Sequence, residues 1–166
     1  YPTPSANDSD SRQLVSGYRR ACHRVAAVPV RYYERNLKSQ SFVMNHHGLG
    51  EHGAKALSKS LSRQASIENV VLRDNAIRGK GAAHLAATLL DNRTLKELDL
   101  SNNDLRSHGL ASFSKVLENS SSLSKLTLEG NHFLDMDSAR LCEALKVGKL
   151  LPPPLRAHAS RRRTTP

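Results

Sequence analysis

The feature that most constrains this fold is a pattern of apolar residues that recurs every 28 positions between residues 39 and 150. Self-similarity at a fixed period of about 20–50 residues indicates a repeat architecture. The frame is clearest in the second unit, which carries Ile67, Val70, Leu72, Asn75, Ile77, Gly81, Leu85 and Leu89. The third unit repeats it with Leu95, Leu98, Leu100, Asn103, Leu105, Gly109, Phe113 and Leu117. Two further units extend the array, which therefore spans 39–66, 67–94, 95–122 and 123–150.

The outer units keep most of the frame. The first has Phe42, Met44, His47, Leu49, Gly53, Leu57 and Leu61, and the fourth has Leu123, Leu126, Leu128, Asn131, Phe133, Asp137, Leu141 and Leu145. Apolar residues two apart at the start of each unit predict a short strand with one buried face, and apolar residues four apart later in the unit predict a helix stripe.

A single unit of this kind cannot bury both apolar faces, so neighbouring units must stack. We therefore predict a right-handed α/β solenoid, a horseshoe segment with a parallel inner sheet and outer helices. Residues 42, 70, 98 and 126 should lie side by side on adjoining strands.

Two positions of the frame that are not apolar, the asparagine position and the glycine position, have structural interpretations. Asn75, Asn103 and Asn131 follow the strands, where a buried amide can pair with N–H and C=O groups of the turns. His47 takes this place in the first unit, which predicts a looser edge turn. Glycines 53, 81 and 109 are expected just before the helices, where the chain turns sharply. Asp137 replaces the fourth glycine and is expected to cap the following helix.

This pattern resembles the leucine-rich repeat family, and within it the ribonuclease-inhibitor-like subclass of long strand and helix units. That subclass includes ribonuclease inhibitor, the Ran GTPase-activating proteins and the sensor arrays of NOD-like receptors. The segments 28–33 and 45–50 are further similar to the start of the vertebrate leucine-rich-repeat-containing protein 74 group. The resemblance covers residues 39–150 and implies a protein-binding module, but it does not identify the ligand.

The segment before the repeats predicts a helical N-terminal cap at residues 11–38, with residues 1–10 disordered. Leu14, Val15, Tyr18, Cys22 and Val25 have helical spacing, and Pro29 ends that helix. The arginines of this cap have two interpretations, a solvated outer face or a contact with an acidic partner or lipid surface. They are Arg12, Arg19, Arg20, Arg24, Arg31 and Arg35.

After the fourth unit the frame fails. It would require an apolar residue at 154 and an asparagine near 159, but these positions hold Pro154 and Ala159. We expect residues 152–166, rich in proline and arginine, to be a disordered tail without a C-terminal cap. An array without that cap exposes an apolar end. The chain is therefore expected to be part of a longer array or to self-associate through this end.

The charge of the chain lies at its ends. The formal net charge is +10. Residues 11–38 carry +6 and residues 151–166 carry +4, whereas residues 1–10 carry −2 and residues 39–150 carry only +2. The repeats therefore offer no basic groove to nucleic acid, and aromatic residues for stacking bases make up only 4%. This distribution disfavours nucleic acid as the partner.

No constellation of catalytic, cofactor-binding or metal-binding residues emerges. Cys22 and Cys142 stand 120 residues apart without metal-type spacing, so we expect two reduced thiols in an intracellular, cytoplasmic protein. His46, His47 and His52 lack partner ligands other than Glu51. The segment 79–81 is interpreted as a turn and not as a phosphate-binding loop. The sequence has no apolar run long enough to span a membrane.

The remaining candidate site is the inner, concave face of the sheet with its adjacent turns. Strand alternation places Ser41 and Val43 there, and the edge turns add His46, Asn102 and Gly130. The predicted partner-binding residues are Asn45, Asn69, Val71, Arg73, Asp74, Glu97, Asp99, Ser101, Lys125, Thr127 and Glu129. A merely solvated sheet is the alternative interpretation.

These observations favour a non-enzymatic module, a scaffold or regulator that binds another protein through its concave face. Two alternatives stay open. One is a GTPase-activating array, which the family resemblance implies. The other is an electrostatic tether in which the basic ends bind RNA or an anionic membrane, and its binding would fall steeply with salt.

Overall fold

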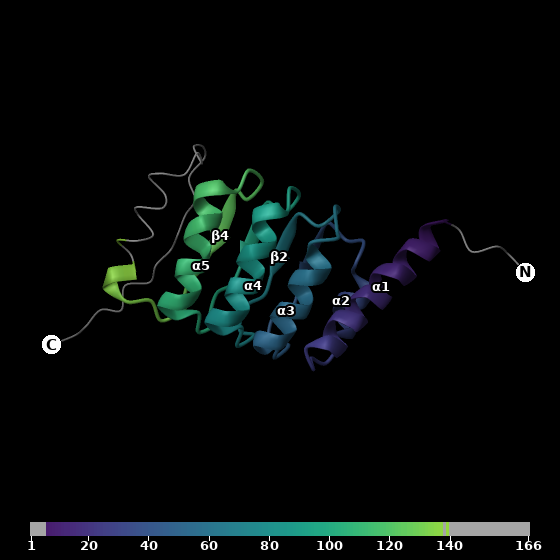
Figure 1. Ribbon diagram of the computed structural model, residues 1–166, viewed down its shortest axis with the longest axis horizontal. Helices are drawn as coiled ribbons and strands as arrows, with labels where there is room; N and C mark the ends of the chain where they lie inside the picture. Colours follow the sequence, from purple (N-terminus) through teal and green to yellow (C-terminus); the bar gives the residue numbers. More distant parts are fainter. Residues whose placement is uncertain (1–5, 138, 140–166) are drawn as a thin grey trace, which may run out of the picture.

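The computed structural model describes residues 6–137 and residue 139. Its elements are α1 (Ala6–Arg24), α2 (Arg31–Arg35), β1 (Ser41–Val43), α3 (Gly50–Leu61), β2 (Asn69–Val71), α4 (Arg78–Asp91), β3 (Glu97–Asp99), α5 (Arg106–Asn119) and β4 (Lys125–Thr127). Helices α3, α4 and α5 stand side by side in one layer with the strands behind them (Figure 1). The predicted strands, turns and helices of the first three units are therefore present in the predicted order.

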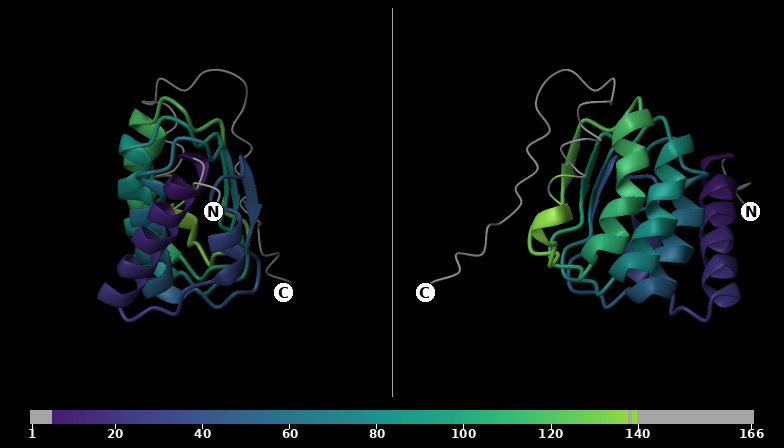
Figure 2. Two further views of the ribbon diagram at one scale, coloured as in Figure 1. Left: turned by 90° about the vertical axis from the view of Figure 1, so that its right-hand side faces the viewer. Right: turned by 60° about the vertical axis from the view of Figure 1, so that its left-hand side comes forward.

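The four strands form one parallel sheet in the order β1, β2, β3, β4. Phe42 pairs in register with Val70, Val70 with Leu98, and Leu98 with Leu126. Each step of this register is 28 residues, so the predicted alignment is confirmed. Figure 2 shows the strands on one side of the molecule and the helices on the other. The fold is the predicted α/β solenoid.

The core lies between these two layers. Phe42, Val70, Leu98 and Leu126 point toward the helices and are all buried. From the other side, the helices contribute the residues that the frame spaces four apart, such as Leu85 and Leu89. Leu141, Leu145, Cys142 and the tail 152–166 lie outside the described residues.

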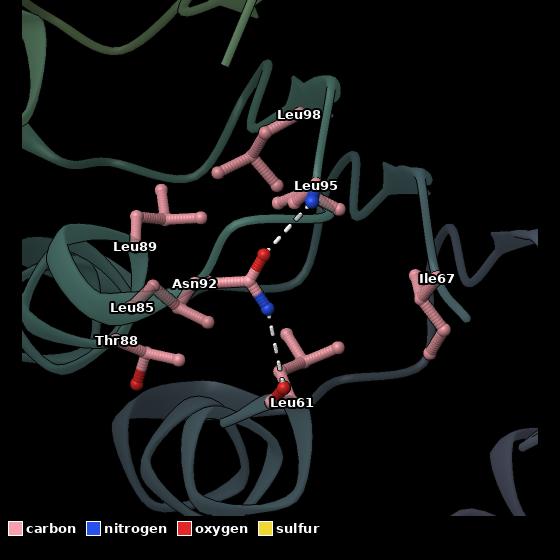
Figure 3. Close-up of a pocket in the computed structure, with 8 residues that line it drawn as sticks. All are labelled: Leu61, Ile67, Leu85, Thr88, Leu89, Asn92, Leu95 and Leu98. Atoms are coloured by element: carbon pink, nitrogen blue, oxygen red, sulfur yellow. Dashed lines mark hydrogen bonds between the residues drawn. The ribbon is translucent and has the colours of Figure 1, made fainter. Parts of the chain in front are cut away.

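A small gap in this core shows how tightly the units pack. It is lined by Leu61, Ile67, Leu85, Thr88, Leu89, Asn92, Leu95 and Leu98 and has a volume of about 10 Å³, close to the smallest space that holds one water molecule (Figure 3). Asn92 closes the helix end beside it, with Oδ1 accepting the N–H of Leu95 at 2.8 Å and Nδ2 donating to the carbonyl of Leu61 at 3.3 Å. The gap is part of the packed core and offers no room for a ligand.

At the N-terminal end, α1 packs against α3, and α2 contacts α1 through the side chains of Tyr33 and Glu34. The rings of Tyr18 and Tyr33 meet edge to face at 4.6 Å, and the ring of Tyr33 meets that of Phe42 at 5.2 Å. Cys22 is a buried free thiol, and burial raises its pKa. These contacts join α1 and α2 to the core of the first repeat.

Helix α1 begins at Ala6 and not at Ser11, so residues 6–10, which we expected to be disordered, are helical. Our prediction used the spacing of apolar residues, and the first one in this segment is Leu14. A helix continues beyond its last buried residue because each added residue can add a backbone hydrogen bond. The apolar pattern therefore locates the packed part of a helix better than its first turn.

The frame asparagines bind the turns of adjacent units together. The Oδ1 atom of Asn103 accepts the backbone N–H groups of Asn75 and Ile77, both in the preceding unit, at 3.0 and 3.3 Å. Its Nδ2 atom donates to the carbonyls of Leu72, Leu100 and Ser101 at 2.8, 3.0 and 3.0 Å. The predicted pairing of a buried amide with turn N–H and C=O groups is confirmed.

Asn75 and Asn131 repeat this arrangement one unit earlier and one unit later. His47, which replaces asparagine in the first unit, instead stacks its ring on Tyr32 at 5.9 Å. In the first unit, a contact with α2 therefore takes the place of the hydrogen bonds that a frame asparagine would make.

The frame glycines lie inside the first helical turns and not before them, and none of Gly53, Gly81 and Gly109 has a positive φ. Their role is close packing. A Cβ at Gly81 would lie 2.8 Å from Ile77 Cγ2 and 3.0 Å from Ala54 Cβ on the neighbouring helix. Our turn interpretation was wrong, because periodicity alone does not distinguish a glycine needed for its φ from one needed for its small size.

Asp137, at the glycine position of the fourth unit, forms hydrogen bonds within its own turn and to the preceding unit. Its carboxylate accepts the backbone N–H of Leu134 at 2.8 Å, three residues earlier, and the hydroxyl of Ser107 at 2.7 Å. A side chain that reaches back over three residues to an N–H group is half of a capping box. Residue 138 and the residues from 140 onward lie outside the described part of the chain, so the expected capping of a following helix stays a prediction. The contact with Ser107 ties this turn to α5.

We expect Asn103→Ala to lower the free energy of unfolding by about 2–4 kcal/mol. The change removes five hydrogen bonds and leaves buried backbone groups without partners. Urea unfolding followed by circular dichroism measures the loss. Asn119→Ala is the control and should change stability by less than about 0.5 kcal/mol, since that amide is exposed and, among the described residues, bonds only the carbonyl of Lys115. Equal losses of unfolding free energy in the two variants would contradict a special role of the frame asparagines.

We expect Gly81→Ala to lower the free energy of unfolding by about 1–3 kcal/mol, because the added methyl overpacks the contact between α3 and α4. Gly17→Ala is the matched control inside α1. A Cβ there would meet only Arg63 Nη1 at 3.9 Å, so the better helix propensity of alanine should stabilise by up to about 1 kcal/mol. Thermal unfolding of the two variants tests whether their effects have opposite signs.

Candidate functional site: the open sheet face

The face of the sheet opposite the helices carries the side chains that alternate with the buried strand residues. We call it the open sheet face. It is formed by Ser41, Val43, Asn45, Asn69, Val71, Arg73, Glu97, Asp99, Ser101, Lys125, Thr127 and Glu129. The register places Ser41, Asn69, Glu97 and Lys125 in one row across the four strands. The structure thus brings the predicted strand residues together on one surface.

The N-terminal half of this face has no charge on its strands. Val43 of β1 is 47% exposed, and its register partner Val71 of β2 is half-buried. Ser41 and Asn69 complete the two strands. This half of the face therefore presents apolar surface to solvent at Val43.

The C-terminal half is charged, and most of its charges pair across neighbouring strands, whereas the exposed Glu129 forms no ion pair with a described residue. Lys125 Nζ lies 3.3 Å from Glu97 Oε2, and just before these strands Lys96 Nζ lies 2.8 Å from Glu68 Oε2. Both pairs join residues 28 apart. Such exposed pairs contribute little to stability, about 0–1 kcal/mol, but they cancel the local charge.

Asp99 and Ser101 differ from our prediction because both are buried. Asp99 Oδ1 accepts the backbone N–H and the hydroxyl of Ser101 at 2.9 and 2.6 Å. Its Oδ2 accepts from Arg73 Nε at 2.6 Å. Strand alternation predicts the direction of a side chain but not its hydrogen bonds. Here the carboxylate of Asp99 and the hydroxyl of Ser101 are bonded within the protein. Among the three, only Arg73 keeps a largely exposed side chain.

The turns that follow the strands form a second row of contacts. His46 Nδ1 lies 2.7 Å from Asp74 Oδ2 in the next unit, and Gly130 lies against the side chain of Asn102. Farther along the same edge, the hydrogen bond from Arg106 holds the pKa of Asp104 below its ordinary value. The carboxylate of Asp74 is therefore hydrogen-bonded to the His46 ring of the preceding unit.

A hollow of about 450 Å³ lies where the segment 26–30 meets the turn 47–52. His47, Glu51, His52 and Arg78 are among its lining residues, and Val28 at its rim is 85% exposed. No group of three or more His, Cys, Asp or Glu side chains in the described part of the chain is arranged to hold a metal ion. Within residues 6–137 and 139, no helix is long and apolar enough to cross a membrane.

The sequence prediction left Val43 and Tyr32 out of the partner-binding set. Val43 could have been included, because alternation puts it beside Val71 on the same face. Tyr32, 42% exposed, had no such signal, because its position depends on the packing of α2 and its stacking on His47.

Comparison with known proteins agrees with this geometry. A family model described as Leucine Rich repeat matches residues 91–114, which cover the end of α4, β3 and much of α5. Among solved structures, the chain is similar to "Leiomodin-1 Actin-Binding Site 2 (ABS2)", with a TM-score of 0.65 and 14% identity over 88% of this chain and 76% of that one.

The fold and the open sheet face define an α/β repeat solenoid. One segment of this solenoid, residues 91–114, matches the Leucine Rich repeat model.

We expect Asp99→Ala to lower the free energy of unfolding by about 1–3 kcal/mol, because it leaves the buried N–H of Ser101 without its acceptor. Glu97→Ala lies on the same strand and removes a carboxylate from an exposed pair, so it should change stability by less than about 0.5 kcal/mol. Urea unfolding of both variants measures the difference. If Asp99→Ala were as stable as Glu97→Ala, Asp99 would be an ordinary surface residue.

Proposed function

We propose that this protein is a non-enzymatic interaction module, a scaffold or regulator, that binds another protein through the open sheet face. The observation that carries the proposal is an uncharged valine pair, the exposed Val43 and the half-buried Val71, beside charges that are mostly paired across the neighbouring strands. An apolar centre with a polar surround is the common composition of a protein-binding patch.

The same surface does not suit a polyanion. Arg73 is bonded to Asp99 and Lys125 to Glu97, so the strands present no row of uncompensated cations. Binding to this face should depend on shape and apolar contact, and therefore only weakly on ionic strength. A nucleic acid would instead need several uncompensated Lys or Arg side chains along its phosphates.

The proposal includes a subclass and a cellular location for the protein. We place the chain in the ribonuclease-inhibitor-like subclass, close to the leucine-rich-repeat-containing protein 74 group, and in the cytoplasm. Self-association through the C-terminal end stays a prediction, because the residues that would form this end lie outside the described part of the chain. The GTPase-activating alternative rests on the resemblance alone, and no described residue adds support for it.

Val43→Glu should abolish partner binding while leaving the fold intact, because Val43 is exposed and a buried carboxylate at the interface would have no counter-ion. Ala87→Glu adds the same charge on the exposed side of α4 and serves as the control. Purified actin is the first protein to test, since the structural neighbour is named for an actin-binding site. Crosslinking and mass spectrometry in a native tissue lysate extend the test to other partners.

The expected result is a partner that the unmodified chain and Ala87→Glu capture equally at low and high salt, and that Val43→Glu does not capture. Circular dichroism of the three proteins should be the same. A partner retained by Val43→Glu, or lost equally with Ala87→Glu, would remove the open sheet face from the proposal.

A further inference from the structure

Helices α1 and α2 carry a second surface that the open sheet face does not explain. We call it the basic cap surface, formed by Arg12, Arg19, Arg20 and Arg24 of α1 and Arg31 and Arg35 of α2. All six residues are exposed. The opposite side of α1, with Tyr18, Ala21 and Cys22, is buried in the core. The helix therefore has one face fixed by packing and one face made largely of guanidinium groups.

This surface already holds one carboxylate. Arg19 Nε donates to Glu34 Oε1 at 2.7 Å, and Arg19 Nη2 donates to Glu34 Oε2 at 3.0 Å, so the pair is bidentate and joins α1 to α2. The hydrogen bond from Arg19, with the added charge of Arg31, holds the pKa of Glu34 below its ordinary value. The local environment thus favours a bound, ionised carboxylate.

The other arginines exceed the acids available to them. Arg20, Arg24, Arg31 and Arg35 form no ion pair with any described residue. Arg20 and Arg24 are one helical turn apart, as are Arg31 and Arg35, so each pair projects two cations in the same direction. Beside them, an open hollow of about 480 Å³ is lined by Ser11, Arg12, Val15, Ser16, Arg19 and Arg20.

We propose that the basic cap surface is a second docking site, which binds an acidic segment of a partner protein through arginine–carboxylate pairs at Arg20 and Arg24. The planar guanidinium matches a carboxylate in the way that Arg19 already matches Glu34. Six of the seven cations in residues 11–38 are arginine and only Lys38 is lysine, which favours geometric pairing over diffuse charge.

Three other occupants fit less well. A membrane surface would be joined by charge alone, because the apolar side of α1 is packed inside the protein and cannot enter a bilayer. A nucleic acid would find few bases to stack on, since Tyr18 and Tyr33 are buried and Tyr32 is stacked on His47. A second copy of this chain, with a net charge of +10, would be repelled from a cationic face.

The test measures binding of a fluorescein-labelled Glu-Ser repeat peptide to the full chain by fluorescence anisotropy. A Gln-Ser repeat peptide is the neutral probe. The variant Arg20→Gln/Arg24→Gln removes two exposed cations without breaking a described contact. The variant Lys80→Gln/Lys115→Gln makes the same change in net charge on the exposed sides of α4 and α5.

We expect the acidic peptide to bind, and its affinity to fall steeply between about 50 and 200 mM salt, whereas the neutral peptide should not bind. The arginine variant should bind about threefold to thirtyfold more weakly, and the lysine variant should bind as the unmodified chain does. Equal weakening in both variants, or none in the arginine variant, would overturn the proposal.

Vesicles containing phosphatidylserine and a single-stranded RNA are measured in parallel with the same variants. If either probe binds more tightly than the acidic peptide, and only the arginine variant loses affinity for it, that class of ligand replaces the acidic segment and the proposal is overturned. Unchanged folding of all variants by circular dichroism makes each of these outcomes interpretable.

Discussion

The structure depends on one contact that repeats from unit to unit, an asparagine carbonyl oxygen held by two backbone N–H groups of the preceding turn. In that turn, residues at every second position have a positive φ, such as Asp74, Ala76 and Arg78. Alternation of left- and right-handed residues points successive N–H groups to one side, which makes a small concave acceptor site. The Oδ1 atom of Asn103 occupies it by accepting from Asn75 and Ile77. The next unit therefore stabilises backbone conformations that cost free energy in isolation.

The hydrogen bonds of the frame asparagines hold adjacent units in a constant register, and this register determines which side chains contact one another. Residues 28 apart lie at equivalent places in adjacent units, so sequence-distant charges become neighbours, as in Glu68 with Lys96 and Glu97 with Lys125. On the helix side, the same stacking brings Gly81 against Ala54, which permits the close approach of α3 and α4. Pairing of charges on the sheet face and small residues between the helices are thus two consequences of one repeat length.

The sequence predicted what depends on periodicity and missed what depends on local detail. Strand register and the role of the asparagines followed from the 28-residue frame, because both recur identically in several units. The burial of Ser101 did not, because it arises from hydrogen bonds to Asp99 that occur in one unit only. The positive φ of Ala76 and Arg78 had no signal in their own residue types, although Gly48 and Gly50 hold the equivalent positions of the first unit. Differences between repeats, and not the repeat itself, determine the candidate sites.

The two proposed surfaces differ in the range over which they act. Paired charges on the open sheet face produce fields that largely cancel a few ångströms away, so this face discriminates partners only after contact. The arginines of α1 and α2 add in sign, and their field extends to about a Debye length, roughly 8–10 Å at physiological salt. A partner with an acidic segment beside an apolar surface would be attracted first by the cap and selected afterwards by the sheet. Because α1 packs directly on α3, the distance between these two surfaces is set by the same core that orders the repeats.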